Sequence, residues 1–198
     1  MKAVLLSIRP QYCELIASGE KTVEVRKTKP KIDTPFKCYI YQTQPKQSLI
    51  EVIRDGDELY GETYHGKTAF ITTPKDVSAG NRTYGRWGKV IGEFVCDEIQ
   101  VFHYGIQTPE DARSWQDCYE GYDWDLYFED GTMLSRKEID DYGAGKFICA
   151  WHISDLVIYD KPKALGEFLA EGRQTYDCPI LTPLKRPPQS WRYVEELC

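Results

Sequence analysis

The stretch from Gly19 to Arg26 constrains this chain more than any other part of the sequence. It reads GEKTVEVR, so a glycine of the kind that often ends a helix leads directly into alternating charged and β-branched residues. If the two valines of this stretch face a core, the threonine, glutamate and arginine between them share the opposite face of a strand. Those three residues are Thr22, Glu24 and Arg26, and Lys21 directly precedes them. The same spacing also fits a solvated strand face whose charges neutralise one another.

Length and composition predict an ordinary globular protein. The chain has 198 residues, of which 41% are hydrophobic and 28% are charged. We expect a single domain over residues 1–198, with elaborated insertions at 43–86 and 103–142 and a C-terminal extension at 172–198. No apolar run has the length of a membrane span, and the first residues lack an apolar leader segment. The sequence therefore predicts a cytoplasmic protein without membrane contact, and it leaves the oligomeric state open.

The cysteines and histidines predict neither disulfides nor a metal site. The seven cysteines are scattered and form no C-x-x-C pair, and there are only three histidines. We expect reduced and mostly buried thiols, no metal and no cofactor.

Charge is distributed unevenly along the chain. The net charge is -6, which argues against a dedicated binder of duplex DNA. Residues 1–50 nevertheless hold nine Lys and Arg against four Asp and Glu, while residues 93–141 hold three against fourteen. A basic N-terminal part beside an acidic segment predicts a local anion site, suited to a small or short ligand.

The hydrophobic pattern predicts mainly strands, with a few capped helices between them. We expect strands over residues 2–8, 22–27, 36–42, 89–102 and 146–159, the fourth bent around Gly92. We expect helices over 10–18, over 108–117, and from the capping box at Ser135 to about Tyr142, with one or two helical turns over 165–170. The end of the C-terminal extension is expected to add a strand or to cover the barrel. Such a set of elements favours a small β-barrel with helices over its openings.

The signature stretch carries a family resemblance. Gly19-x-Lys21-x-x-Glu24-x-Arg26, preceded by residues 6–10 (LSIRP) and a short helix, resembles the hallmark of the ASCH domain family. Residues 88–99 and 147–162 are similar to the central and closing strands of that family. The resemblance implies an α+β, mainly β fold, namely a small PUA-like β-barrel with short helices over its openings and an insertion. It also implies a cleft that binds RNA or a nucleoside or nucleotide.

Two kinds of hydrolase remain open under this resemblance. In related N4-acetylcytidine amidohydrolases a lysine at the position of Lys21 acts with a threonine and a glutamate. The threonine position is occupied here by Glu24, and the nearest candidate for the second glutamate is Glu129. A metal-independent ribonuclease would instead use Glu24 as the general base, with Lys21 and Arg26 on the phosphate. The catalytic candidates are Lys21, Glu24 and Glu129.

A site that binds RNA or a nucleoside without cleaving it requires cations, a hydrogen-bond acceptor and aromatic rings for base stacking. Arg26 suits a carboxylate or phosphate, and a glutamate accepts hydrogen bonds from an exocyclic amine. Aromatic residues of the later strands offer faces for base stacking, although core packing is the commoner fate of such rings. The start of the first helix is a second place for a phosphate. The binding candidates are Ser7, Arg9, Thr22, Arg26, Tyr39, Tyr41 and Trp151.

These interpretations lead to one geometric prediction and one further alternative. We expect Glu24 and Arg26 to point into a solvent-reachable cleft, with Lys21 at its edge. The alternative is a protein-interaction module that uses the acidic, aromatic residues 120–130.

Overall fold

The computed structural model describes residues 1–44, 62–64, 67–69, 86–105, 114–117, 131–144, 147–172 and 180–197. The strands are β1 (Lys2–Ile8), β2 (Val23–Arg26), β3 (Phe36–Gln42), β4 (Glu62–Tyr64), β5 (Lys67–Ala69), β6 (Lys89–Cys96), β7 (Ile99–Gly105), β8 (Ser114–Asp117), β9 (Ile148–His152), β10 (Ser154–Ala164), β11 (Leu169–Glu171), β12 (Leu181–Pro183) and β13 (Trp191–Glu195). The helices are α1 (Pro10–Ser18), α4 (Arg136–Gly143) and the 3-10 turn η1 (Leu165–Glu167).

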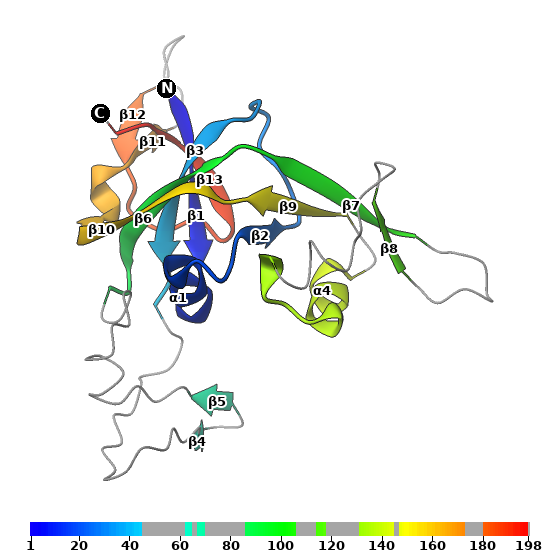
Figure 1. Ribbon diagram of the computed structural model, residues 1–198. Coiled ribbons are helices and arrows are strands. Elements are labelled where there is room, and N and C mark those ends of the chain that lie inside the picture. The colour runs from blue at the N-terminus through cyan, green and yellow to red at the C-terminus, as the bar shows by residue number, and fades with distance from the viewer. Residues whose placement is uncertain are drawn as a thin grey trace.

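Two sheets form the body of the described part (Figure 1). The larger sheet has the strand order β10-β6-β3-β1-β13, and the smaller has the order β2-β9-β7-β8. Among the described strands the chain passes between these two sheets four times: from β1 into β2, from β2 into β3, from β6 into β7 and from β9 into β10. The last two crossings are the long green and yellow ribbons of Figure 1. Strand β13 pairs antiparallel with β1, so the C-terminal extension adds a strand, as one of the two expectations for it stated.

Helix α1 delivers the chain into the signature strand. Pro10 stands at the start of the helix, where its missing N–H leaves no hydrogen bond unmade. Gly19 ends the helix in the left-handed conformation, with φ of 85°, and its N–H donates to the carbonyl of Ile16. The predicted helix over 10–18 is therefore confirmed, and β2 begins four residues after Gly19.

Three apolar clusters cover both faces of the two sheets. The main core lies between the sheets and α1, with Ile8, Ile16, Ile40, Ile91 and Trp151 among its members. A second cluster covers the opposite face of the larger sheet and contains Tyr39, Tyr41 and Phe168. A third joins β2 and β9 to α4 through Val23, Val25 and Ile139. Because both faces are covered, β1 reads as a nearly continuous apolar run, with Ala3 through Leu6 all buried.

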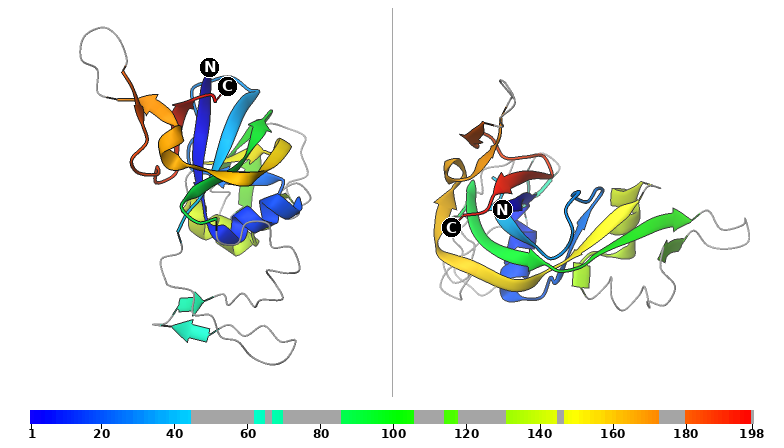
Figure 2. Two further views of the ribbon diagram at one scale, coloured as in Figure 1. Left: turned by 90° about the vertical axis from the view of Figure 1, so that its left-hand side faces the viewer. Right: turned by 90° about the horizontal axis from the view of Figure 1, so that it is seen from above.

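The mainly β fold with short helices is confirmed, whereas the closed barrel is not. In the part of the chain described here, hydrogen-bonded strands form four open sheets, two of them pairs: β4 with β5 and β11 with β12. The two long ribbons that run from one sheet into the other are strongly curved in the view from above (Figure 2). Among the described strands, the edges β10 and β13 of the larger sheet and β2 and β8 of the smaller do not pair with each other, so neither sheet closes.

Several predicted elements differ from the structure in their limits. The strand expected over 89–102 is two strands, because the chain leaves the larger sheet at Asp97 and Glu98. The expected irregularity near Gly92 is present, since the pairing with β3 shifts register between Ile40 and Tyr41. The strand expected over 146–159 divides after His152 into β9 and β10. The helix expected over 108–117 is wrong at its end, where residues 114–117 form β8.

Other local predictions are confirmed. Ser135 caps α4 with a capping box, in which its hydroxyl accepts from the N–H of Glu138 and the Glu138 carboxylate accepts from the N–H of Ser135. Of the one or two helical turns expected over 165–170, one is present as a 3-10 turn at 165–167, and the residues after it enter β11. Four cysteines in the described residues are free and buried: Cys13, Cys38, Cys96 and Cys149. No helix within the described ranges is long and apolar enough to span a bilayer.

Candidate functional site

Strand β2 is covered on both faces, and its polar residues lie on the side of the main core. Val23 and Val25 point to the α4 side, where they join the third cluster. Alternation then turns Glu24 and Arg26 to the other side, where their partners in β9 are Trp151 and Cys149 of the main core. Both charged residues are 7% exposed. The charges of the signature are therefore buried rather than displayed on a solvated strand face.

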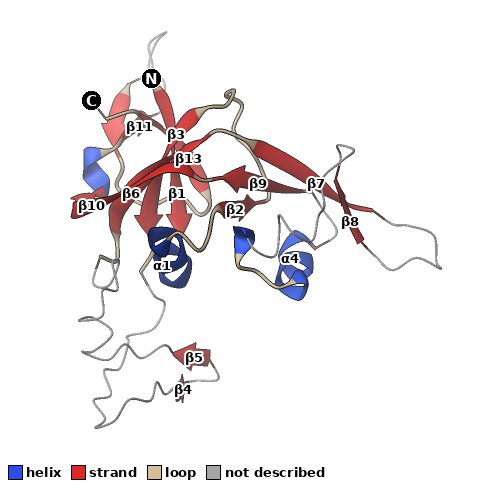
Figure 3. Cartoon of the chain, in the orientation of Figure 1, coloured by secondary structure: helices blue, strands red, loops and turns tan. Residues whose placement is uncertain are grey.

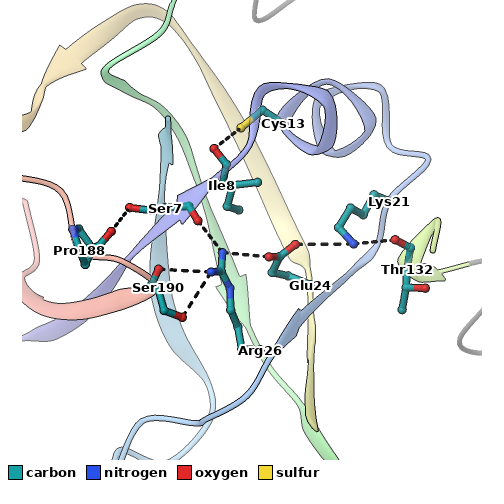
Figure 4. A network of polar contacts seen from close by, with 9 residues as sticks. All are labelled: Ser7, Ile8, Cys13, Lys21, Glu24, Arg26, Thr132, Pro188 and Ser190. Atoms are coloured by element: carbon teal, nitrogen blue, oxygen red, sulfur yellow. Dashed lines mark hydrogen bonds and ion pairs between the residues drawn. The ribbon is translucent and has the colours of Figure 1, made fainter. Parts of the chain in front are cut away.

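Arg26 ties three segments of the chain together (Figure 4). Its Nη2 lies 2.9 Å from the Glu24 carboxylate and donates to the carbonyl of Ser7, also at 2.9 Å. Its Nη1 reaches the carbonyl and hydroxyl of Ser190, each at 3.4 Å. The Ser7 hydroxyl in turn donates to the carbonyl of Pro188 at 2.7 Å. The guanidinium thus joins β2, β1 and the segment that leads into β13.

Lys21 stands on the other side of Glu24. Its Nζ donates to the carbonyl of Thr132 at 2.6 Å and lies 3.6 Å from the second carboxylate oxygen of Glu24. The ammonium also lies 5.4 Å from the centre of the Tyr12 ring in α1. Glu24 is therefore held between two cations, one at each oxygen, as Figure 4 shows.

Burial dominates the electrostatics of Lys21. The residue is 2% exposed, and this burial lowers the pKa of its ammonium, with a smaller contribution in the same direction from the charge of Arg26. The negative charge of Glu24 opposes that shift. The net effect makes the neutral amine more accessible than it is for a lysine in water. Burial also raises the pKa of Tyr12, helped by the charges of Glu138 and Glu24 and opposed by Arg9.

A close backbone approach fixes the carbonyl that Lys21 binds. The Thr22 N–H donates to the carbonyl of Gly131 at 2.9 Å. A Cβ at Gly131 would lie 2.9 Å from a methyl of Val23, so a larger residue would push residues 131–132 away from β2. Glycine at this position therefore allows the Thr132 carbonyl to reach the ammonium.

Exposure corrects one geometric prediction. Lys21 was expected at the edge of a cleft, yet it is the most buried of the three signature residues. The physical reason is the turn between α1 and β2, in which the Lys21 N–H donates to the carbonyl of Leu15 and the side chain lies beneath residues 131–132. Thr22, predicted on the face of Glu24 and Arg26, lies before β2 begins and is exposed.

The other predicted binding residues fall into two groups. Ser7 belongs to the network through its carbonyl and hydroxyl, whereas Arg9 is exposed at the N-cap of α1. Tyr39 and Tyr41 lie in the second cluster, on the opposite face of the larger sheet from the main core. Trp151 is 0% exposed and packs against Phe36 and Trp191, with ring centres 5.8 and 6.0 Å away. The structure therefore places these three rings in the core.

Two of the sequence predictions fall outside the described residues, and three residues of the network were not predicted. Glu129 and the acidic stretch 120–130 lie outside the described residues. Sequence reasoning missed Tyr12, Thr132 and Ser190. A signal existed only for Tyr12, which belongs to the apolar stripe of the helix that ends at Gly19. Thr132 contributes a backbone carbonyl, and no pattern of side chains predicts such a contact.

The fold and the signature define the class, and a family model identifies it. The model of the ASCH domain matches residues 6–130, which is more than half of the chain. The chain therefore belongs to the ASCH domain family, as the signature predicted.

Comparison with individual proteins gives two further findings. The chain is 33% identical over 76 residues to a protein of Zymomonas mobilis subsp. mobilis named an ASCH domain-containing ribonuclease. That match covers 36% of this chain and 51% of the relative, so it spans about half of the relative's length. The crystal structure of ASCH from Zymomonas mobilis superposes with a TM-score of 0.48 at 16% identity, over 98% of this chain and 88% of the other. A mutant form of the same protein superposes at 0.46 and 17%, over 99% and 92%. The two structural matches, with TM-scores below 0.5 and identities below 20%, say nothing about the function of this chain.

Proposed function

We propose that this chain binds RNA and that Lys21, Glu24 and Arg26 form its binding site. The observation that carries the proposal is the buried cation–anion–cation network at the ASCH signature. Buried charges of this kind are weak contributors to stability, because desolvation offsets their attraction, and they gather at functional sites. The name of the Zymomonas mobilis relative, a ribonuclease, supports RNA as the ligand class.

Each residue has a separate role in this proposal. Arg26 and Lys21 supply donors for phosphate or carbonyl oxygens of the ligand. Glu24 holds both cations in place and offsets one of their two positive charges while the site is empty. The Thr132 carbonyl, 2.6 Å from the Lys21 ammonium, occupies the position that a ligand oxygen would take.

Access to Lys21 requires a local rearrangement. Because Lys21 is 2% exposed, a ligand reaches its ammonium only when residues 131–132 move from the start of β2. The exchange replaces one acceptor oxygen by another, so the ammonium is never left without a partner.

Fluorescence anisotropy tests the binding. Labelled single-stranded RNA is titrated with the wild-type protein, with Lys21→Met, and with Lys161→Met as a control that removes an exposed charge on β10. We expect Lys21→Met to weaken binding at least about tenfold, which is 1.4 kcal/mol, and Lys161→Met to change it less than about twofold. Equal affinity of Lys21→Met and the wild type would contradict the proposed site. Binding of free modified nucleosides without RNA would favour the nucleoside interpretation instead.

Hydrolysis is the second candidate function, and the lowered pKa of Lys21 favours it. A neutral amine at this position can take the proton from a ribose 2′-hydroxyl. The 2′-oxygen then attacks phosphorus and the bond to the 5′-oxygen breaks. The proton held by the Lys21 ammonium returns to the departing 5′-oxygen, directly or through water, so the products are a 2′,3′-cyclic phosphate and a new 5′-hydroxyl. Arg26 would stabilise the charge that develops on the phosphate. Lys21 suits the role of base better than Glu24, because both oxygens of Glu24 already contact cations.

A turnover assay in the presence of EDTA separates the hydrolase alternatives from pure binding. Cleavage should produce cyclic phosphate ends, and Lys21→Met should abolish it. An N4-acetylated cytidine in the same assay tests the amidohydrolase interpretation through release of acetate. RNA that is bound but stays intact under these conditions would contradict metal-independent cleavage.

A further inference from the structure

The loop between β2 and β3 displays lysines at alternating positions. Lys27, Lys29 and Lys31 are exposed, whereas Pro30 is buried and Ile32 packs against the main core. The loop contains a single carboxylate, Asp33. Among the residues that the structure describes, no carboxylate forms an ion pair with any of the three lysines. The Lys27 ammonium lies 4.9 Å from the centre of the Tyr142 ring in α4, so its charge is directed toward that helix. A chain of net charge -6 therefore presents local positive charge along this loop.

Aromatic residues of β13 hold this loop in place. The indole N–H of Trp191 donates to the hydroxyl of Thr28 at 3.0 Å, and the N–H of Lys31 donates to the hydroxyl of Tyr193. The two rings meet edge to face with centres 5.3 Å apart, and both are partly exposed. Trp191 also packs against Trp151, and the Lys2 ammonium lies 5.8 Å from the centre of the Tyr193 ring, which adds a fourth cation here. We call these two rings and the three lysines the Lys27–Lys31 surface. Its lysines follow a backbone that is already ordered, so little chain entropy is lost when a ligand binds.

This surface is continuous with the buried network. Arg26 directly precedes Lys27, and the residue that Arg26 contacts in the C-terminal segment, Ser190, directly precedes Trp191. The two chain segments that meet at the guanidinium therefore continue outward as the loop and as β13. A ligand that leaves the network along them meets first cations and then ring faces.

We propose that the Lys27–Lys31 surface is the path of a single-stranded RNA as it leaves the Lys21–Glu24–Arg26 site. The phosphates would lie at Lys27, Lys29 and Lys31, and bases would stack on the rings of Trp191 and Tyr193. Single strands favour such a surface, because their bases are free to stack, whereas a duplex hides its base faces. This inference rests on the proposed function, since it extends the same site.

The salt dependence of binding tests the path. Each phosphate contact of a single strand contributes about 0.7 to the slope of log affinity against log salt. Three variants are titrated with a short labelled oligouridylate between about 50 and 200 mM salt. One replaces Lys27, Lys29 and Lys31 by Gln, and a matched control replaces Lys89, Lys161 and Lys163 by Gln. The control removes the same charge at β6 and β10, and β10 is the sheet edge opposite β13. The third variant is Trp191→Leu.

The inference predicts a different result for each variant. The loop triple should reduce the slope by about two, and the control triple should leave it within about one half of the wild-type value. Trp191→Leu should weaken binding at unchanged slope and reduce the preference for the single strand over a duplex of the same length. Equal slopes for the two triples, or duplex bound as tightly as single strand by the wild type, would overturn the inference. Tight binding with equal slopes would leave the proposed function standing, whereas absence of RNA binding by the wild type would refute both.

Discussion

Replacing Arg26 by alanine should destabilise the protein far more than an arginine on an open strand face would. The guanidinium is the closer of the two cations at Glu24, with Nη2 at 2.9 Å, whereas the Lys21 ammonium lies at 3.6 Å. Its removal also leaves the Ser7 carbonyl without its donor, in a residue that is 9% exposed. Both acceptors would stay buried with fewer partners than they have in the wild type.

The structure sets the size of the effect. An unpaired buried polar group costs about 1–3 kcal/mol, and breaking a buried ion pair costs about 3–5 kcal/mol. Lys21 remains near Glu24 and relieves part of this cost. We therefore expect the free energy of unfolding to fall by about 3 kcal/mol. For a chain of this size that loss lowers Tm by about 6–12 °C.

Urea unfolding at 25 °C measures this change, and Arg192→Ala provides the matched control. Arg192 is also on a strand, but it is exposed and makes one hydrogen bond, to the carbonyl of Glu171. The control should lose less than about 0.5 kcal/mol. If Arg26→Ala and Arg192→Ala unfold at the same urea concentration, the reasoning from the buried network is refuted.

Three further predictions concern the elements around the network. Gly19→Ala should lower the free energy of unfolding by about 1 kcal/mol in urea, because φ is 85° at this position. Gly166→Ala should change it little, since a Cβ added at Gly166, like one at Gly19, would meet no atom within 4 Å. Equal losses would contradict the role of the left-handed cap. Ser135→Ala should lower the free energy of unfolding by about 1 kcal/mol, because the capping box is lost, whereas the exposed Ser18→Ala should lower it by less than about 0.5 kcal/mol. A loss at Ser135 no larger than that at Ser18 would show that the cap is dispensable. Because the pKa of Lys21 is lowered in the folded state, the unfolded chain binds more protons between that pKa and 10.5. The stability of the wild type should therefore rise relative to that of Lys21→Met as the pH increases from 7 toward 10.5. If the stabilities of the two proteins change in parallel with pH, the burial of the charge is contradicted.

The fold was predicted best from the sequence where local backbone rules decide the structure. Pro10, Gly19 and the capping box at Ser135 predicted helix ends, because each satisfies or removes a particular backbone group. Strand β3 was predicted at its observed limits from alternation alone. The limits of β6, β7, β9 and β10 were not predictable in this way. The apolar run continues through each crossing between sheets, so hydrophobicity does not mark the point where the partner strand changes.

The shared face of Glu24 and Arg26 was predicted from the sequence, but the depth of their burial was not. Alternation placed Glu24 and Arg26 on one face, and the structure agrees. Sequence periodicity cannot show that this face lies against a second sheet, which is why Lys21 was expected at an edge. The aromatic candidates failed for the same reason: Tyr39, Tyr41 and Trp151 belong to strands with both faces covered. Composition alone favoured a short ligand, whereas the ordered row of exposed lysines after Arg26 favours a longer strand.

The central claim is that RNA binds at the Lys21–Glu24–Arg26 network, and photo-crosslinking tests it most directly. Single-stranded RNA containing 4-thiouridine is bound to the wild-type protein and irradiated, and the crosslinked peptides are identified by mass spectrometry. We expect crosslinks within residues 10–31 and at residues 131–132, whose carbonyls accept from Thr22 and Lys21. Crosslinks confined to β10 and the adjoining part of β6, at the far edge of the larger sheet, would contradict it.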